Sequence, residues 1–98
     1  MIRKVIFMPA ARLEIIDAQD WYEKEKTGLG TAFRAEVDHQ VARIMAQPLH
    51  FPRMLADVHR AKLRHFPYGL FFRSSDEAIY VIACFHSSRN PFVWQSRV

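Results

Sequence analysis

The chain has 98 residues, half of them hydrophobic, with 14 Lys and Arg against 10 Asp and Glu. This length accommodates one domain, spanning residues 1–98, and leaves no room for a second. The net charge of +4 favours an anionic partner, such as nucleic acid, an acidic protein or anionic lipid, without choosing among them. The single cysteine, Cys84, excludes an internal disulfide and a cysteine-based zinc site, and its apolar neighbours indicate a buried, inert thiol.

The N-terminal part predicts a strand followed by a helix. Residues 2–8 have the composition of a strand, and Pro9 ends it in the position that suits the first turn of a helix. The apolar run here is too short for a signal-peptide core or a membrane span. We therefore expect a cytoplasmic protein without membrane association. One face of the helix is apolar and consists of Ala11, Ile15, Ala18 and Tyr22.

Two further apolar residues, Leu13 and Ile16, lie on the opposite side of this helix. Either the helix is sandwiched between two layers, or it shows an apolar flank to a partner. The sequence leaves both readings open.

A second amphipathic helix follows the TGLG turn and ends near Gln47-Pro48. Its apolar positions are Leu29, Phe33, Val37, Val41 and Ile44. Two helices joined by so short a turn predict an antiparallel hairpin. The stretch PLHFPRML after it has two prolines and no periodicity, which indicates a loop.

From Asp57 the hydrophobic period falls to two, as in strands. DVHRAKLRHF, PYGLFFR and AIYVIACF are three predicted strands, the last apolar on both faces and therefore central, with SSDE as a turn. Sequential strands joined by short turns predict an antiparallel meander. The expected fold is α+β: a small, largely antiparallel sheet against the helical hairpin, in the order β-α-α-β-β-β with a short C-terminal segment.

Three cations alternate along the first strand of the meander. Arg60, Lys62 and Arg64 point one way, while Ala61 and Leu63 point the other. They form either an ordinary solvated face, or a basic stripe for phosphates or acidic side chains.

The C-terminal stretch CFHSSRNPFVWQSRV brings together His86, Arg89, Trp94 and Arg97. Histidine with arginine can provide acid–base and phosphate-stabilising chemistry, as RNA cleavage requires. The alternative is structural: the histidine ends a strand, the tryptophan packs the tail on the sheet, and the arginines pair with carboxylates. Residue types alone favour the structural reading.

Other chemistries have no support in the pattern. The histidines lack metal-ligand spacing, and the chain has no glycine-rich phosphate loop and no nucleophile-elbow motif. We expect no cofactor and no metal.

The layout resembles the RelE/ParE superfamily of toxins from bacterial type II toxin–antitoxin modules. The resemblance spans the chain: a first strand into PAARLEIIDAQDWY, LGTAFRAEV at the second helix, and LRHFPYGLFFR followed by IYVIACFHSSRNPFVWQSR. The order of basic strand, Phe-Pro-Tyr, apolar hairpin, His, Arg and terminal Trp is similar to the ParE-like, plasmid-stabilisation branch.

This resemblance implies a toxin that a cognate, typically acidic antitoxin neutralises, with operator DNA bound only through the antitoxin. The RelE branch cleaves mRNA in the ribosomal A site, whereas the ParE branch poisons DNA gyrase. The chain departs from the nuclease pattern at Gly69, where that branch usually has arginine, and at Trp94, which replaces a tyrosine. Gyrase poisoning is therefore favoured, with ribosome-dependent mRNA cleavage as the alternative and a non-toxic binding module or decayed toxin as a third reading.

The resemblance also implies roles for particular residues. A nuclease would use Arg64, His86 and Arg89, whereas no catalytic residue is assigned for a gyrase poison. Leu13 and Ile16 are candidates for antitoxin contact. The candidates for target binding are Arg60, Lys62, Arg64, His86, Arg89, Trp94 and Arg97.

Overall fold

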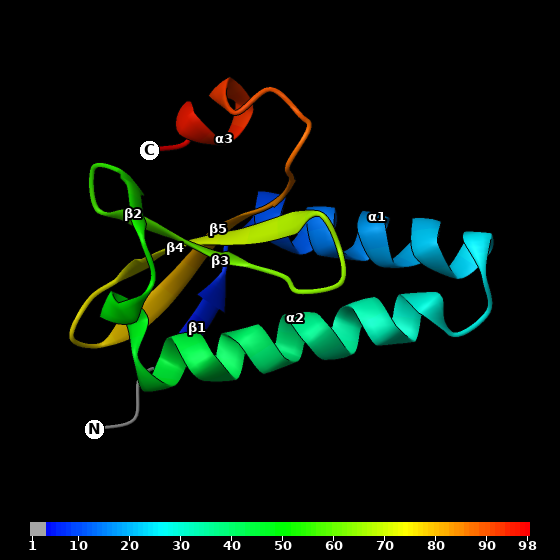
Figure 1. The fold of residues 1–98 in the computed structure, drawn as a ribbon. Coiled ribbons are helices and arrows are strands. Elements are labelled where there is room, and N and C mark those ends of the chain that lie inside the picture. Colours follow the sequence, from blue (N-terminus) through cyan, green and yellow to red (C-terminus); the bar gives the residue numbers. More distant parts are fainter. Residues whose placement is uncertain (1–3) are drawn as a thin grey trace.

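The computed structural model describes residues 4–98, which form one sheet with helices on both faces (Figure 1). The elements follow the predicted order: β1 (Lys4–Phe7), α1 (Pro9–Glu25), α2 (Leu29–Ala46), a 3-10 turn η1 (Pro48–His50), β2 (Arg53–Leu55), β3 (Val58–Lys62), β4 (Tyr68–Ser74), β5 (Ala78–His86) and α3 (Phe92–Gln95). The α+β architecture and its helical hairpin are thus confirmed. Residues 2 and 3 of the predicted first strand lie outside the described residues.

The sheet has five strands in the order β1-β5-β4-β3-β2. β3, β4 and β5 form the predicted antiparallel meander. β1 joins it by pairing parallel to β5, with Val5 opposite Ile79. Because β1 covers the far side of β5, that strand lies inside the sheet and is buried on both faces, as its continuous apolar sequence predicted.

The prediction of a plain loop for PLHFPRML is wrong. The stretch contains the turn η1 and the edge strand β2, which pairs antiparallel with β3 through Arg53 opposite His59. All three residues of β2 are exposed. A three-residue strand without a buried face has no hydrophobic alternation, so its sequence carried no strand signal.

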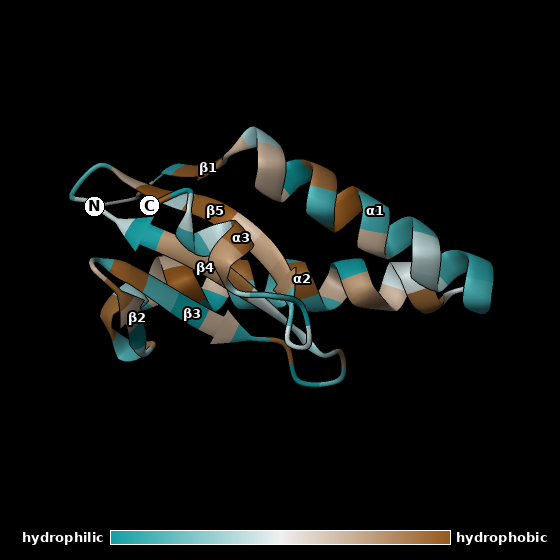
Figure 2. Ribbon diagram, turned by 90° about the horizontal axis from the view of Figure 1, so that it is seen from above, coloured by the Kyte–Doolittle hydropathy of each residue, from teal (hydrophilic) through white to brown (hydrophobic). Residues whose placement is uncertain are grey.

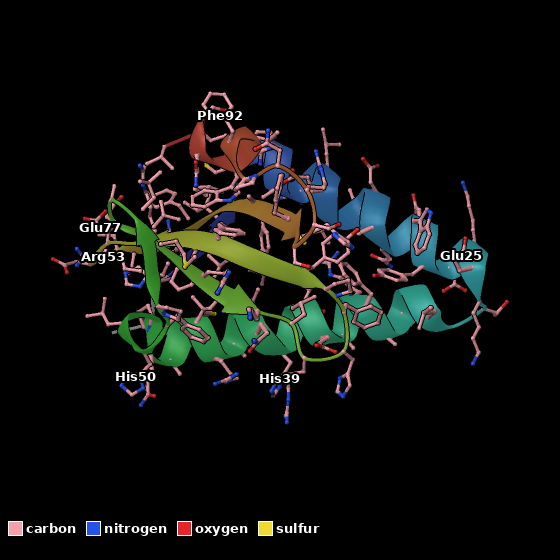
Figure 3. All side chains as sticks on the ribbon, turned by 45° about the horizontal axis from the view of Figure 1, so that its top comes forward. Glu25, His39, His50, Arg53, Glu77 and Phe92 are labelled. Carbon is pink, nitrogen blue, oxygen red and sulfur yellow. The ribbon has the colours of Figure 1, made fainter. Side chains whose placement is uncertain are left out.

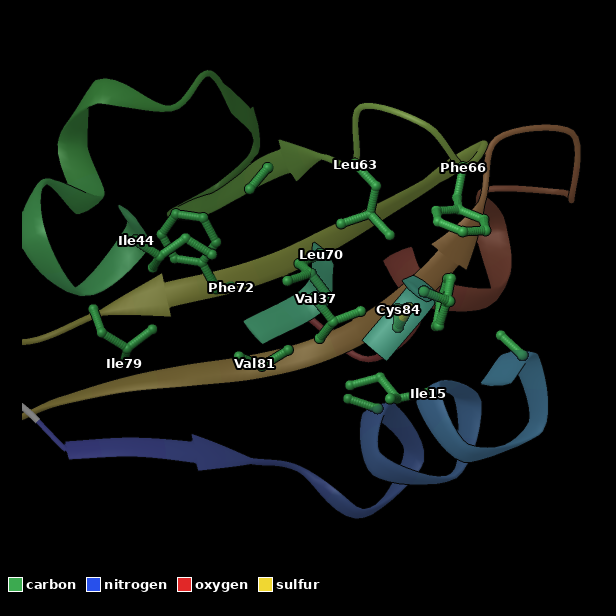
Figure 4. Close-up of a cluster of buried hydrophobic side chains, with 14 residues drawn as sticks. Ile15, Val37, Ile44, Leu63, Phe66, Leu70, Phe72, Ile79, Val81 and Cys84 are labelled. Carbon is green, nitrogen blue, oxygen red and sulfur yellow. The ribbon is translucent and has the colours of Figure 1, made fainter. Parts of the chain in front are cut away.

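α1 and α2 pack together on one face of the sheet, here called the helix face. The predicted apolar faces of both helices are buried or partly buried there, against strand residues such as Leu70, Phe72 and Val81 (Figure 4). Figure 2 shows hydrophobic colouring along β4 and β5 and mixed colouring along both helices, as expected for helices with one solvated side. No helix among residues 4–98 is long and apolar enough to cross a membrane.

The turn between the two helices is fixed by a close contact and by a side-chain cap. A Cβ on Gly30 would lie 2.5 Å from the carbonyl oxygen of Gln19, so only glycine lets α2 start this near α1. The carboxylate of Glu23 accepts hydrogen bonds from the N–H groups of Gly28 and Gly30, at 2.9 and 3.0 Å. These bonds satisfy donors that a helix N-terminus leaves free.

The opposite side of the sheet is here called the groove face, and within residues 4–98 the helix that packs on it is the four-residue α3. Phe92 points away from the sheet at the outer side of this helix (Figure 3). So short a helix leaves much of the groove face open, and the candidate site lies there.

Candidate functional site

A groove of about 540 Å³ runs along the groove face between β3 and the C-terminal segment. Its floor comes from β4 and β5, one wall from β3 with Met54 of β2, and the other wall from the segment after β5. Five of the seven predicted target-binding residues line it: Arg60, Lys62, His86, Arg89 and Trp94. Arg64 and Arg97 do not.

The alternation of β3 places two cations in the groove. Arg60 and Lys62 face it, whereas Ala61 between them is buried in the core of the helix face. Opposite Lys62 lies Gly69, whose absent side chain makes room for the stem of Arg60. A Cβ at Gly69 would lie 3.1 Å from Cγ and 3.3 Å from Cδ of Arg60.

A small apolar cluster lies beneath the groove, where Phe71 and Phe85 of the floor meet Trp94 of the C-terminal wall. The indole of Trp94 stacks on the ring of Phe71 with 4.3 Å between the centroids, and only 3% of the residue is exposed. The burial of Trp94 agrees with the structural reading of the C-terminal stretch, and its contact with a target stays a prediction. Its burial secures α3 to the sheet because a large aromatic gains most from leaving water.

Arg89 forms the second cationic side of the groove. Its guanidinium carbon lies 4.5 Å from the centroid of the Phe85 ring, which is a cation–π geometry. The side chain remains 53% exposed, and its nearest carboxylate, that of Glu14, is 4.0 Å away. Arg89 is thus held in place by an aromatic ring while its charge stays available to a ligand.

His86 lies at the end of β5, with its ring 5.0 Å from that of Tyr68 in an edge-on arrangement. Its Nδ1 accepts a hydrogen bond from the backbone N–H of Ser88 at 3.0 Å, and the Ser88 hydroxyl is 2.8 Å from the same atom. A nitrogen that accepts from an N–H cannot carry a proton, so the neutral ring holds its proton on Nε2. In this arrangement His86 offers a hydrogen-bond donor and no proton acceptor.

Arg97 is committed to an ion pair with Glu14 of α1 outside the groove. Its two terminal nitrogens donate to the two carboxylate oxygens at 2.9 Å each, and one also donates to the carbonyl of Ile82 at 3.1 Å. The hydrogen bonds to Glu14, and the charge of its carboxylate, raise the pKa of the Arg97 guanidinium against the opposing effect of burial. Arg97 therefore ties the C-terminus to the body of the domain rather than presenting its charge to a target.

Sequence reasoning missed Glu14. Besides holding Arg97, it accepts the backbone N–H of Cys84 at 3.1 Å, beyond the point where β1 stops pairing with β5. Glu14 and Arg97 are 83 residues apart, so neither helical spacing nor strand alternation links them. The only sequence signal was a charged residue beside the buried position Ile15.

Arg64 lies beyond the end of β3 and does not line the groove, so it does not continue the predicted cationic row. Its backbone N–H donates to Glu36 of α2, as do the N–H of His65 at 2.8 Å and the His65 ring at 3.0 Å. Burial would raise the pKa of the Glu36 carboxyl, but these hydrogen bonds together lower it. They hold the loop that supplies Phe66 and Pro67 to the groove wall.

The two candidate antitoxin contacts are both on the surface. Leu13 is 60% exposed and Ile16 is 42% exposed, so α1 is not sandwiched between two layers. Whether an antitoxin covers them stays a prediction. Cys84 is buried, and burial raises the pKa of its thiol to about 12, in keeping with an inert thiol. No three His, Cys, Asp or Glu side chains between Lys4 and Val98 are placed to hold a metal ion.

Comparison with known proteins identifies the fold. No family model matches the sequence, and no curated protein matches it. Among solved structures, the chain is similar to the chromosomal ParDE TA system from P. aeruginosa, with a TM-score of 0.74 and 14% identity over 87% of this chain and 96% of that one. It is also similar to a mutant of E. coli toxin RelE in complex with an antitoxin RelBc peptide, with a TM-score of 0.63 and 20% identity over 100% of this chain and 96% of that one.

These likenesses confirm, at the level of the fold, the resemblance to the RelE/ParE superfamily that the sequence indicated. The chain has the fold of the RelE and ParE toxins.

Proposed function

We propose that the chain is the toxin of a type II toxin–antitoxin module of the ParE-like branch, acting in the cytoplasm. A cognate acidic antitoxin neutralises it, and the free toxin arrests growth by binding DNA gyrase. The support is the RelE/ParE fold together with the groove, whose cations Arg60, Lys62 and Arg89 surround an apolar floor.

One observation carries the choice of binding over cleavage: the groove has cations but lacks a placed base. Cleaving RNA through its 2′-hydroxyl needs a group that takes a proton. In the groove, Nδ1 of His86 is occupied by Ser88, and burial raises the pKa of the Tyr68 phenol, which keeps that group protonated. Within the described residues, no Asp or Glu lines the groove. The arrangement suits a surface that holds an anionic partner.

Two surfaces fit an antitoxin. Acidic segments complement the cationic groove, since opposite charge speeds encounter and restricts partner choice. The exposed pair Leu13 and Ile16 on α1 offers a separate apolar contact, on the far side of the helix from the buried core. Operator DNA would then be bound through the antitoxin alone.

The test is to induce this chain alone in a bacterium and to read growth together with a DNA-damage reporter in single cells. Gyrase poisoning predicts arrest accompanied by a rise of the reporter. The double substitution of Arg60 and Arg89 to Ala removes charge from the groove and is expected to relieve the arrest. Arg34→Ala is the matched control, because Arg34 lies on α2 and pairs with Asp38 away from the groove.

The outcomes separate the alternatives. If growth stops while the DNA-damage reporter stays flat, and new transcript ends appear at codon positions, the target is the ribosome and not gyrase. The groove would then be an endonuclease site. Harmless expression in several bacterial hosts would overturn the toxin proposal itself. Full toxicity of the double variant would remove the groove from the mechanism.

A further inference from the structure

The solvent side of α1 carries three large apolar side chains. Trp21 is 57% exposed and joins the exposed residues Leu13 and Ile16, whereas Ile15 on the core side of the helix is 2% exposed. Residues three and four apart adjoin on a helix, so positions 13, 16, 17, 20 and 21 form one continuous surface. An exposed tryptophan with apolar neighbours is typical of a surface that binds another protein.

Two carboxylates lie between these apolar side chains. Asp17 and Asp20 are three residues apart on the same side of α1, and both are exposed. Among residues 4–98 neither of them forms an ion pair, not even with the neighbouring Lys24. Like charges at this spacing repel each other, and both lie beyond the first turn, where the helix dipole would favour a carboxylate. The stability of the helix therefore does not account for them.

Other carboxylates of the two helices do have roles within the chain. Four of them accept hydrogen bonds from backbone or side-chain donors of this chain: Glu14, Glu23, Glu36 and Asp38. Asp17 and Asp20 differ from these four, because they have no such partner among the described residues and stand beside exposed apolar side chains. We call the surface formed by Leu13, Ile16, Asp17, Asp20 and Trp21 the α1 flank.

The α1 flank and the groove have opposite charges. The groove contains Arg60, Lys62 and Arg89, and within the described residues no carboxylate lines it. An acidic segment that complements the groove would be repelled by the two carboxylates of the α1 flank. A partner that complements the α1 flank is therefore cationic, and it has apolar residues to cover the exposed tryptophan, leucine and isoleucine.

The backbone of α1 favours a helical partner. In the middle of a helix every N–H and C=O group is bonded within the helix, so this surface offers no backbone partner to an extended segment. A second helix satisfies its own backbone and packs its side chains between those of α1. From Leu13 to Trp21 the helix rises about 12 Å, which about two turns of a partner helix would cover.

We propose that the α1 flank is a docking surface for a cationic amphipathic helix of another protein. The apolar side of that helix covers Leu13, Ile16 and Trp21, and Lys or Arg side chains beside it pair with Asp17 and Asp20. The inference deepens the proposed function and rests on it in one respect only, that the helix belongs to the antitoxin. The antitoxin would then bind through segments of opposite charge, an acidic one in the groove and a cationic one on α1.

The test uses the fluorescence of Trp21 as the probe of binding. Trp94 is buried, so a blue shift of the emission is expected to come from Trp21 and to be absent in Trp21→Phe. The ligand is an acetylated, amidated peptide of Leu and Lys with Leu at helical spacing, about four turns long. We expect a blue shift that saturates on titration. The same peptide with Glu in place of Lys, or with central prolines that prevent a helix, should leave the emission unchanged.

Neutralising both carboxylates tests whether charge selects the partner. The double variant Asp17→Asn and Asp20→Asn should bind the Lys peptide about tenfold more weakly and with less dependence on salt. The matched control is Asp76→Asn with Glu77→Gln, which removes the same charge from the exposed turn between β4 and β5. Glu77 lies at the opposite end of the molecule from the hairpin tip (Figure 3), so this control should bind as the parent chain does.

Several results would overturn the docking surface. They are an unmoved Trp21 emission at millimolar Lys peptide, equal binding of the Glu peptide, and a double Asn variant that binds as tightly as the parent. Equal binding of the proline-containing peptide would overturn the helical partner. A chain that sediments as a dimer with Trp21 already shielded would assign the flank to a second copy. A blue shift with phosphatidylglycerol vesicles but not with the peptide would assign it to a lipid surface.

This result is independent of the growth experiment. A chain that arrests growth but does not bind the Lys peptide loses the docking surface and keeps the proposed function. A chain that binds the peptide through the α1 flank but is harmless in cells loses the proposed function and keeps the docking surface.

Discussion

Both faces of the sheet bury aromatic side chains, but they differ in how much of the face a helix covers. On the helix face, two long helices cover the strands, and Phe33 is fully buried against Tyr22, Phe66 and Tyr68. On the groove face, four residues of α3 cover a cluster centred on Trp94 and Phe71 and leave a groove beside it. We therefore expect the helix face to contribute most of the free energy of unfolding, while the groove face keeps the charges of Arg60, Lys62 and Arg89 beside an open groove.

Deleting an aromatic ring from each face is the strongest test of this contrast. Phe33→Ala should cost about 3–5 kcal/mol, because the helices cannot close the cavity. That is a large part of the roughly 5–15 kcal/mol expected for a domain. Trp94→Ala should cost less, since the C-terminal segment can detach while the rest stays folded.

Urea unfolding gives both free energies, and amide exchange should show the Trp94→Ala effect concentrated in residues 92–98. Equal global losses for the two variants would mean that the groove face is as integral to the fold as the helix face.

The second prediction concerns the ion pair between Glu14 and Arg97, which ties α1 to the C-terminal segment. Glu14 is 14% and Arg97 25% exposed, so their pair is better shielded than a surface pair. Glu14→Gln should destabilise the chain by about 1–3 kcal/mol, because it leaves the Arg97 charge without its carboxylate.

A double-mutant cycle with Glu14→Gln and Arg97→Gln measures the coupling directly. The same cycle on the exposed pair Arg34 and Asp38 is the control and should give about 0.3–0.5 kcal/mol. If the coupling energy between Glu14 and Arg97 is no larger than that of the control pair, this ion pair does not hold the C-terminal segment in place.

The smallest predicted effect depends on pH and concerns the loop that forms the groove wall. The hydrogen bonds from His65 and Arg64 hold the folded pKa of Glu36 below its usual 4.5. The folded state thus binds this proton less readily than the unfolded chain does. The contribution of Glu36 is fully present above pH 4.5 and is lost as the pH falls through the lower, folded value.

Glu36→Gln should therefore cost about 1 kcal/mol at pH 7 and progressively less in acid. Urea midpoints measured from pH 7 to pH 3 check this. Glu25→Gln, at the exposed tip of the hairpin (Figure 3), is the control and should show no such trend. A cost for Glu36→Gln that does not change with pH would show that the carboxylate charge plays no part.

Much of the fold was readable from local patterns. Helical spacing identified the apolar side chains that both helices bury or partly bury on the helix face, but it missed the buried Gln40 of α2. Strand alternation placed Arg60 and Lys62 opposite Ala61. Local patterns failed where a partner lay far along the chain. The exposed strand β2 gave no periodic signal, and the parallel pairing of β1 with β5 joins segments separated by two helices.

The candidate site divides in the same way. Charge and strand position brought out Arg60, Lys62, His86 and Arg89, all of which line the groove. The same criteria also selected Arg97, which is held by Glu14, and Arg64, which lies past the end of its strand. Residue type predicts that an arginine needs an anion, but only the fold decides whether the anion comes from within the chain.

The sequence by itself determined which residues form helices and strands and which face of each is apolar, because those properties depend on neighbours within a few positions. Tertiary structure alone decided that Trp94 is buried and that Arg97 is paired. Burial and pairing depend on which distant segments meet. In this chain, α1, the sheet and the C-terminal segment come together so that Arg97 is paired with Glu14, whereas Arg60, Lys62 and Arg89 line the groove.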